Sequence, residues 1–361
     1  MNSNNFSRRD LLKAMAALGL ASQAPSLFAS SSKKRIGVAL VGLGGYSRGQ
    51  LAPALQLTEH CYLAGIVTGS PEKIPLWQER YQIPDAHVYN YENMHQMTNN
   101  PAIDVVYVVL PTGLHAQYSI IGANAGKHVW CEKPMAMNVA ECKAIIAACK
   151  KNKVQLTIGY RMQHEPNTQR VIAMATEKPY GKIQTITAQA GYRFSGSDHG
   201  WRSDPALGGG AMYDMGVYPL NAARYTSGEE PIALTARTES TRPLYKDVDE
   251  TTIFSLEFPS GTIANCETSY ARSSNILRAD CAKGWYELQP FQSYNGVGGR
   301  TSDGTLLNQP IANQQARQMD NDALAILNNS PVLVPGEEGM RDIRLVEAIF
   351  KAAKEGKRIT L

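Results

Sequence analysis

The segment Arg35-Ile-Gly-Val-Ala-Leu-Val-Gly-Leu-Gly-Gly-Tyr-Ser47 joins an apolar run of strand length to a glycine-rich turn, and residues 49–57 are predicted to form a helix. The order strand, tight turn, helix is typical of a dinucleotide-binding fold. There, Gly42 allows the turn, Gly44 lets the backbone approach a diphosphate, and the helix N-terminus faces the anion. A glycine-rich loop can also be only a turn. The nucleotide reading predicts contacts from Gly42, Gly44, Gly45, Tyr46 and Ser47.

A second predicted strand, residues 62–67, ends where a ribose-binding acid would normally stand. This sequence has Thr68-Gly69-Ser70 there, with Lys73 close behind. A carboxylate would bind the ribose 2′-hydroxyl and repel a 2′-phosphate, whereas small hydroxyls and a lysine favour the phosphate. The segment therefore predicts NADP in preference to NAD. An alternative is that Ser70 only caps the next helix, with Pro71 at its first position.

The 361 residues, 43% of them hydrophobic, are ample for two packed domains. Further strands at 104–110, 127–131 and 154–159 alternate with helices at 115–125 and 139–151, which predicts a doubly wound parallel sheet. Later strands at 183–189, 232–238, 251–258 and 261–268 alternate in polarity, and a helix at 340–354 follows. We predict an α/β protein with a Rossmann domain over 34–159. A second α+β domain over 160–361, built on a large, mostly antiparallel sheet, would bind substrate and mediate oligomerisation.

Residues 1–30 are predicted to be a targeting segment. Ser7-Arg8-Arg9-Asp10-Leu11-Leu12-Lys13 precedes a modestly apolar run that ends in small residues, a pattern typical of a twin-arginine signal. We expect cleavage between Ala24 and Ser31, and export to the periplasm in a folded state that can carry a cofactor. The apolar run is too short for a comfortable membrane span, so no membrane insertion is expected after the signal is removed.

Charge and cysteine usage exclude several classes of protein. The formal charge is +4, and the first thirty residues carry three cations against one Asp, so the remainder carries about +2, which predicts no nucleic-acid partner. The six cysteines lack a CxxC or metal-ligand spacing and are interpreted as buried thiols. No His, Cys and carboxylate cluster has metal-ligand spacing either, so no metal is expected.

Several motifs together resemble the Gfo/Idh/MocA oxidoreductases, and within them the glucose-fructose oxidoreductase branch. The resemblance runs from about residue 34 to the end of the chain. Its motifs are Gly-Leu-Gly-x-Tyr at 42–46, Leu110-Pro111 before His115, Glu132-Lys133-Pro134, Gly159-Tyr160-Arg161, Trp201-Arg202, Gly208-Gly209-Gly210, Asp214-Met-Gly-Val-Tyr218, Asn221, and Pro335-Gly336-Glu337-Glu338-Gly339-Met340.

The resemblance implies a catalytic pair, Lys133 and Tyr218, with Asp214 lining the same pocket. Most of the wider family has histidine where Tyr218 stands. Tyr218 could accept the proton of a sugar hydroxyl while Lys133 holds the hydroxyl oxygen. A surface lysine and a core tyrosine are the structural alternatives. Candidate substrate contacts are Tyr160, Arg161, Arg202, Asp214 and Tyr218, with Asp198 a weaker one; further cofactor contacts are Ser70, Lys73, Leu110, Pro111, His115, Glu132, Lys133 and Arg161.

Three functions are consistent with these residues. The first is an exported NADP-dependent sugar oxidoreductase that oxidises an aldose and can reduce a second sugar to recycle its cofactor. The second is a nicotinamide-dependent glycoside hydrolase with no net redox change, and the third is a non-catalytic sensor. A small-molecule sugar is the expected partner, and the family resemblance implies a homodimer or homotetramer. Glucose-fructose oxidoreductase has a long proline-rich arm around its nucleotide, whereas only a few residues separate the predicted cleavage from the first strand here, so the resemblance alone does not imply permanent NADP retention or arm-mediated oligomerisation.

Overall fold

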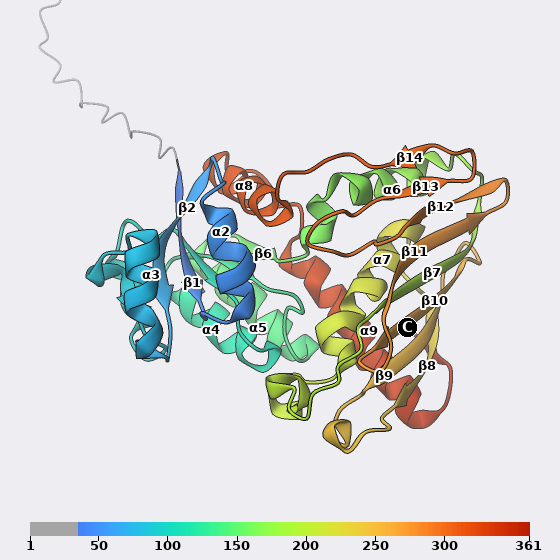
Figure 1. Cartoon of the computed structure of the whole chain (residues 1–361), viewed down its shortest axis with the longest axis horizontal. Coiled ribbons are helices and arrows are strands. Elements are labelled where there is room, and N and C mark those ends of the chain that lie inside the picture. Colours follow the sequence, from blue (N-terminus) through green and yellow to red (C-terminus); the bar gives the residue numbers. More distant parts are fainter. Residues whose placement is uncertain (1–34) are drawn as a thin grey trace, which may run out of the picture. The chain divides into compact units, whose positions relative to one another are not determined.

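Six parallel strands form a doubly wound sheet in residues 35–361, the part of the chain that the computed structural model describes (Figure 1). Their spatial order is β3-β2-β1-β4-β5-β6, so the winding reverses between β1 and β4. Ligands of such sheets bind at this switch point, beyond the carboxyl ends of the strands. The strands are β1 (Ile36–Val41), β2 (Cys61–Val67), β3 (Val88–Tyr89), β4 (Val105–Val108), β5 (His128–Cys131) and β6 (Leu156–Ile158).

Helices cover both faces of this sheet. Val38 and Leu40 of β1 pack into one core, and Ala39 and Val41 pack into the other. Because both faces are buried, the strand is apolar throughout, as parallel sheets require. The first core is covered by α2 (Ala52–Leu55), α3 (Ile74–Tyr81) and α8 (Gln314–Leu327), and the second by α4 (Thr112–Asn124) and α5 (Val139–Asn152).

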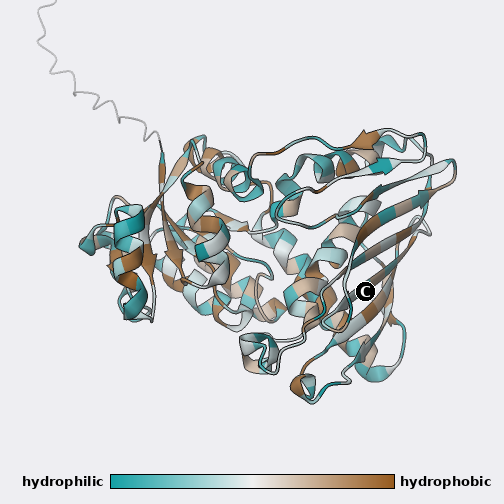
Figure 2. Cartoon of the chain, viewed as in Figure 1, coloured by the Kyte–Doolittle hydropathy of each residue, from teal (hydrophilic) through white to brown (hydrophobic). Residues whose placement is uncertain are grey.

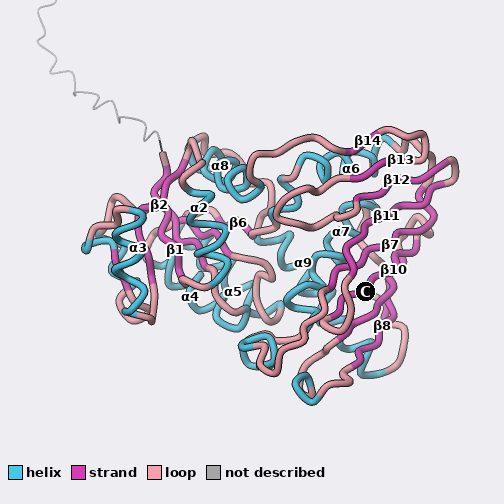
Figure 3. The backbone as a smooth tube through the Cα atoms, viewed as in Figure 1, coloured by secondary structure: helices cyan, strands magenta, loops and turns pink. Residues whose placement is uncertain are grey.

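A second, nine-stranded sheet has the order β14-β13-β12-β11-β7-β10-β9-β8-β15 (Figure 3). Its neighbours pair antiparallel except β7 and β10, which are parallel. The predicted fold class, a Rossmann domain followed by a domain with a mostly antiparallel sheet, is confirmed. The strands are β7 (Ile183–Gly191), β8 (Ala233–Glu239), β9 (Thr251–Glu257), β10 (Ile263–Ser269), β11 (Ser274–Cys281), β12 (Gly284–Leu288), β13 (Gly299–Thr301), β14 (Leu306–Leu307) and β15 (Ile359–Thr360).

One face of the nine-stranded sheet packs against α6 (Pro166–Glu177), α7 (Val217–Ser227) and α9 (Gly336–Glu355) (Figure 1). Burial alternates along its strands, as in β9, where Phe254 and Leu256 are buried and their neighbours are half-exposed. The strands of both sheets carry much of the hydrophobic colouring in Figure 2. This alternation is typical of a sheet with one covered face, and α7 packs on that face against β7 and β10.

Three helices begin earlier than the sequence analysis predicted. After β1, the backbone is already helical at Gly45 and Tyr46 and passes through a π-turn, Ser47–Leu51, rather than starting at Gly49. Pro53 has no N–H to donate to the Gly49 carbonyl, and the wider π-turn lets the Ala52 N–H reach the Ser47 carbonyl instead. The helix N-terminus therefore lies directly at the glycine loop.

The other two early starts are at α4 and α9. Helix α4 begins at Thr112 rather than 115, immediately after the extended Pro111. Helix α9 begins at Gly336 rather than 340, and its first turn contains Glu337 and Glu338, which interact favourably with the positive end of the helix dipole. Gly336 packs so closely that a Cβ there would come within 2.4 Å of the Leu156 side chain.

All six cysteines lie within the described residues as buried free thiols, as predicted. Burial raises the pKa of the thiols of Cys61, Cys142 and Cys149 to about 12. The predicted twin-arginine signal, residues 1–30, lies outside the described residues.

The packing of α4 on β4 generates a stability prediction. A Cβ on Gly122 would lie 2.2 Å from Cγ2 of the buried Val106, so Gly122→Ala should lower the free energy of unfolding by about 1–3 kcal/mol. The control is Gly49→Ala, where no described atom lies within 4 Å and helix propensity predicts a neutral or slightly stabilising effect. Denaturant titration of both variants measures this, and equal stabilities would contradict the close packing.

Candidate functional site

The glycine loop after β1 leaves its backbone open to a ligand. Gly42 has φ +99°, and a Cβ there would lie 2.4 Å from the Val109 carbonyl oxygen, so both conformation and space require glycine. At Gly44 and Gly45, no described atom beyond the adjacent backbone lies within 4 Å of the point that a Cβ would occupy. The following helix begins at this loop, so its free N–H groups face the same space. The geometry fits a diphosphate.

The end of β2 carries Thr68, Ser70 and Lys73 to the same cavity. The Ser70 N–H donates to Thr68 Oγ1 over 3.0 Å, which fixes the turn. Ser70 stands at the N-cap position of the following helix, as the alternative interpretation expected, but its hydroxyl accepts no capping hydrogen bond within the described residues. Among the described residues that line the cavity, the acids are Glu132 and Asp214. Ser70 and Lys73 thus leave this end of the cavity without a carboxylate.

One cavity of about 960 Å³ connects the glycine loop with the second domain. This volume lies at the upper end of the range for small-molecule sites. Fourteen of the predicted site residues line it: Gly42, Gly44, Gly45, Tyr46, Ser70, Lys73, Leu110, Pro111, Glu132, Lys133, Arg161, Arg202, Asp214 and Tyr218.

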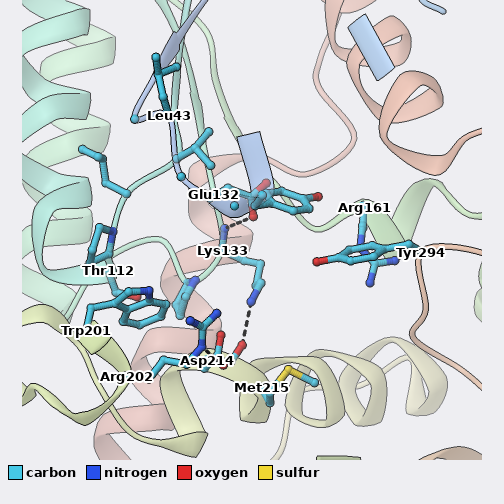
Figure 4. A pocket seen from close by; sticks show the side chains of 18 of the residues that line it. Leu43, Thr112, Glu132, Lys133, Arg161, Trp201, Arg202, Asp214, Met215 and Tyr294 are labelled. Carbon is cyan, nitrogen blue, oxygen red and sulfur yellow. Dashed lines mark hydrogen bonds and ion pairs between the residues drawn. The ribbon is translucent and has the colours of Figure 1, made fainter. Parts of the chain in front are cut away.

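Lys133 follows β5 and reaches across the cavity (Figure 4). Its ammonium donates to the backbone carbonyl of Asp214 over 2.7 Å and lies 4.7 Å from the centroid of the Tyr218 ring. The predicted pair therefore meets within one cavity, although its two members come from different domains. Lys133 is therefore not an ordinary surface lysine, since it lines the cavity and donates to the Asp214 carbonyl.

Asp214 is buried and densely hydrogen-bonded. Its Oδ2 accepts from Arg202 Nε (2.7 Å), the Tyr270 hydroxyl (3.1 Å) and the Tyr192 hydroxyl (3.2 Å). Burial disfavours the charged form, but the Arg202 guanidinium and the Lys133 ammonium outweigh this and hold the pKa of the Asp214 carboxyl below its usual range. Asp214 is therefore an anion that orients Arg202 on the cavity wall, and the geometry gives it an electrostatic role.

A second acid, Asp249, fixes the turn that contains Asp214 and leads into α7, where Tyr218 lies. Asp249 Oδ2 accepts from the Met212 N–H (2.8 Å) and the Thr252 hydroxyl (2.7 Å), at the start of the π-turn Met212–Gly216. Gly210, with φ +101°, allows this approach, since a Cβ would lie 2.1 Å from Asp249 Oδ1. Burial raises the pKa of the Asp249 carboxyl to about 6.

Glu132 is held by two consecutive buried hydrogen bonds, through Tyr107 to Gln318. The Tyr107 hydroxyl donates to Glu132 Oε1 over 2.7 Å, and Gln318 Nε2 of α8 donates to the Tyr107 oxygen over 3.3 Å. Burial raises the pKa of the Glu132 carboxyl. The carboxyl is therefore fixed at the cavity wall by a helix of the second domain.

Arg161 is 2% exposed, and its guanidinium borders the cavity. Its Nη1 donates to Gln314 Oε1 (2.5 Å) and to the Ser293 carbonyl (2.8 Å). The same guanidinium lies 5.5 Å from the Tyr218 ring centroid and 5.0 Å from the Tyr294 ring centroid. Arg161 is thus a fixed cation that joins the candidate catalytic tyrosine to a segment near the glycine loop.

Four predicted residues lie outside the cavity lining. Tyr160 is 1% exposed and packs in the core beside the Asp342 carboxyl, because the chain turns there into a 3-10 helix whose first residue, Arg161, takes the cavity side. This corrects its prediction as a substrate contact. Ser47 is buried beneath the loop, where its hydroxyl donates to the Gly42 carbonyl over 2.6 Å. The weaker candidate, Asp198, is exposed and accepts from the Gly200 N–H.

The fourth is His115, which is buried behind the wall of the cavity instead of lining it. Its ring nitrogens lie 2.7 Å from the carbonyl oxygens of Pro134 and Leu110, which follow β5 and β4. Burial lowers the pKa of the His115 imidazole to about 4. A neutral imidazole carries one N–H, so it donates to only one of these two carbonyls at a time while the ring packs between the two strand ends.

Several lining residues were missed as site residues, chiefly Tyr91, Tyr192, Trp201, Gln292, Ser293 and Tyr294. Trp201 belongs to the Trp201-Arg202 motif of the family resemblance, but the sequence analysis assigned it no contact with cofactor or substrate. Tyr91 and Tyr294 lie in irregular segments, and no local sequence pattern marks such positions. Their contribution depends on where the folded chain brings these segments.

Residues 35–361 hold neither a metal-ligand cluster nor a membrane-spanning helix. There, no group of three or more His, Cys, Asp or Glu side chains is arranged to hold a metal ion. In the same range, no helix combines the length and apolarity needed to cross a membrane.

Comparison with known proteins identifies the family. Residues 36–160 match the oxidoreductase family model with an NAD-binding Rossmann fold, residues 168–287 match the GFO/IDH/MocA C-terminal domain, and residues 292–361 match the oxidoreductase family C-terminal alpha/beta domain. The chain belongs to the Gfo/Idh/MocA oxidoreductase family. The predicted family and the predicted enzyme class, an NAD(P)-dependent oxidoreductase, are confirmed.

Individual relatives cover most of the chain. The crystal structure of an aldose-aldose oxidoreductase from Caulobacter crescentus, complexed with glycerol, is 39% identical, has a TM-score of 0.87, and is matched over 91% of this chain and 100% of that one. A D-xylose 1-dehydrogenase [NADP(+)] of Haloarcula marismortui is 27% identical over 90% of this chain and 92% of its own length. A D-glucoside 3-dehydrogenase of Escherichia coli is 28% identical over 72% of this chain and 79% of its own length.

The buried Asp249 generates a pH prediction. Its folded-state pKa of about 6 exceeds the value of about 3.9 for an unfolded Asp, so the folded chain binds this proton more tightly. Its contribution to the free energy of unfolding therefore increases as the pH falls from about 6 to about 4. Asp249→Asn should remove that part of the pH dependence, measured by denaturant titration at both ends of the window, whereas the exposed neighbour change Asp247→Asn should retain it. An unchanged pH profile in Asp249→Asn would refute the assignment.

Proposed function

We propose that this protein is an exported NADP-dependent sugar oxidoreductase that transfers hydride between an aldose and nicotinamide and can recycle its own cofactor by reducing a second sugar. The observation that carries the proposal is the meeting of Lys133 and Tyr218 in the cavity that begins at the open glycine loop. The relatives described as aldose-aldose oxidoreductase and D-xylose 1-dehydrogenase [NADP(+)] support a sugar substrate.

The residues at the second-domain end of the cavity suit a polyhydroxylated substrate. The Lys133 ammonium has donors beyond the one given to the Asp214 carbonyl, and can hold the oxygen of a substrate hydroxyl. The Tyr218 phenolate oxygen would accept the proton of that hydroxyl and become the neutral phenol. A bound nicotinamide supplies the hydride acceptor, so the carbon loses a hydride and the oxygen a proton, and an aldose becomes a lactone. Arg202 borders the same space, and its Nη groups offer further donors.

The preference for NADP rests on the end of β2. Ser70 and Lys73 line the cavity where a ribose-binding carboxylate would normally lie. A hydroxyl and an ammonium can bind a 2′-phosphate that such a carboxylate would repel. The relatives named as NADP(+)-dependent xylose dehydrogenases support the same choice.

Export and self-recycling belong together in this proposal. The twin-arginine pattern at residues 7–13 predicts transport of a folded protein, which can carry a nucleotide loaded before export. A retained cofactor must be reoxidised in place, and a second sugar is an acceptor of the chemistry that the same residues already handle. The name aldose-aldose oxidoreductase, given to a 39% identical protein, supports such a two-sugar cycle.

The test is made on the purified protein. It is denatured, any released nucleotide is identified by mass, and the absorbance of reduced nicotinamide is followed while the native protein receives a panel of aldoses. NADP that one sugar reduces and another reoxidises is the expected result. Release of free sugar from a glycoside without net redox change would instead establish the hydrolase, and neither reaction with any added nucleotide would overturn the proposal.

The proton-accepting role of Tyr218 gives one prediction. Tyr218→Phe should leave NADP binding intact and reduce sugar turnover by about 100-fold or more, because the general base is lost while the ring contacts remain. The matched control is Tyr213→Phe, in the π-turn just before Tyr218. This change removes a hydroxyl that donates to the Met137 carbonyl, and it should retain turnover. Steady-state kinetics with nucleotide binding by fluorescence measure both, and near-normal turnover of Tyr218→Phe would remove Tyr218 from the mechanism.

The proposed preference for NADP gives a second prediction. Ser70→Asp should weaken NADP relative to NAD by about tenfold or more, through repulsion between the new carboxylate and the 2′-phosphate. Ser70→Ala is the control, since it removes the hydroxyl without adding charge. Dissociation constants for both nucleotides decide the matter, and an unchanged ratio in Ser70→Asp would mean that residue 70 does not face the phosphate.

A further inference from the structure

The segment between β12 and β13, residues 289–298, forms a wall of the nucleotide cavity that no sequence motif marks. Gln292, Ser293 and Tyr294 of this segment line the cavity together with Gly42–Tyr46. The two groups of residues are about 250 positions apart in the sequence and belong to different domains. A nucleotide on the glycine loop would therefore have a second wall supplied by the other domain.

Hydrogen bonds hold this segment firmly in place. Asn275 of β11 accepts at Oδ1 from the N–H groups of Phe291 and Gln292, both over 3.0 Å, and its Nδ2 donates to the Gln292 carbonyl. Arg161 donates to the Ser293 carbonyl from the opposite side. Phe291 is fully buried, so the segment is anchored immediately before the residues that reach the cavity.

Tyr294 connects the two walls directly. Its ring stacks on the ring of Tyr46, with centroids 5.8 Å apart and planes 27° apart, and Tyr46 directly follows the glycines of the loop. Its other contact is the Arg161 guanidinium, 5.0 Å from the ring centroid. Figure 4 shows Arg161 and Tyr294 next to each other at one side of the cavity. The stack thus spans the space between the glycine loop and the second domain.

The exposure of Tyr294 is informative. The residue is 43% exposed although its ring contacts the half-buried Tyr46 and the buried Arg161. A large aromatic ring at a cavity rim, held by a stack that joins two walls, must be displaced before a ligand lying between those walls can leave. The Arg161 end of the contact is immobile, because that guanidinium is buried and bonded to Gln314 and Ser293.

We propose that Tyr294 is the residue that retains the dinucleotide: its stack with Tyr46 and Arg161 closes the cavity across the diphosphate and slows the release of NADP(H). This inference rests on the proposed function for the identity of the nucleotide. It deepens that function, because a two-sugar cycle in a compartment poor in nucleotide requires a cofactor that stays bound between half-reactions. Retention here needs no additional arm of the chain.

The experiment measures release directly and uses no sugar. The full chain is loaded with NADPH, mixed rapidly with a large excess of NADP, and the loss of protein-bound NADPH fluorescence is followed. An aromatic stack and a cation–π contact together correspond to about tenfold or more, so Tyr294→Ala should release NADPH at least about ten times faster than the unchanged protein. Tyr294→Phe keeps both ring contacts and should stay within about twofold.

Two further variants make the result decisive. Tyr294→Leu keeps apolar bulk but loses the aromatic ring. It should release NADPH as fast as Tyr294→Ala, which would show that the lost ring, and not the lost bulk, accelerates release. Leu306→Ala removes an exposed apolar side chain on the adjoining β14, outside the cavity, and should leave release unchanged. Thermal unfolding of each variant verifies that it is folded.

The outcomes are separable from those of the proposed function. Unchanged release from both Tyr294→Ala and Tyr294→Leu would overturn the retention role, as would Tyr294→Phe releasing as fast as Tyr294→Ala. Normal slow release from a protein that oxidises no aldose would overturn the sugar assignment and leave retention standing. Failure of the unchanged protein to bind NADPH would overturn both.

Discussion

The hydrogen bond from the Lys133 ammonium to the Asp214 carbonyl, 2.7 Å long, joins the two halves of the site. Lys133 stands at the carboxyl end of a strand in the parallel sheet, and Asp214 stands in the π-turn that opens onto α7 of the second domain. Either residue alone would only border a cavity. Because the bond brings the lysine over the Tyr218 ring, the nucleotide loop and the substrate end form one continuous space. The catalytic proposal depends on that arrangement.

The ionisable groups at the cavity are held in place by their ionic and hydrogen-bonding partners. Asp214 is kept ionised against the cost of burial by Arg202 and Lys133, Glu132 is held by Tyr107 and Gln318, and the Arg161 guanidinium is bonded to Gln314. Each partner lies outside the glycine loop, and two of them belong to α8, which packs on the first domain. Preorganised groups of this kind stabilise developing charge without having to reorient during reaction. The second domain therefore sets the electrostatics of the nucleotide end as well as the substrate end.

The sequence predicted those features that arise from local pattern. Continuous apolar runs identified the parallel strands. Gly42 and Gly44 identified the loop, because a tight turn and a close approach of the backbone to a ligand depend on a few adjacent residues. Helix starts were less predictable: the missing N–H of Pro53 changes the helix upstream through a π-turn. Tyr160 and Arg161 could not be assigned to opposite sides of their segment without the fold. Tyr294 could not be predicted, since its contact with Tyr46 depends on where the second domain places an irregular segment.

The six buried cysteines have a consequence for the chain's chemistry. Thiol–disulfide exchange requires a thiolate with access to its partner. Burial raises the pKa of every one of these thiols above its usual range, including Cys281, whose value is about 11. At neutral pH, residues 35–361 thus present almost no nucleophilic sulfur while the domain is folded. A chain that folds first and meets an oxidising compartment afterwards would arrive already protected from mispaired disulfides, whereas the same chain translocated unfolded would expose all six sulfurs to oxidation.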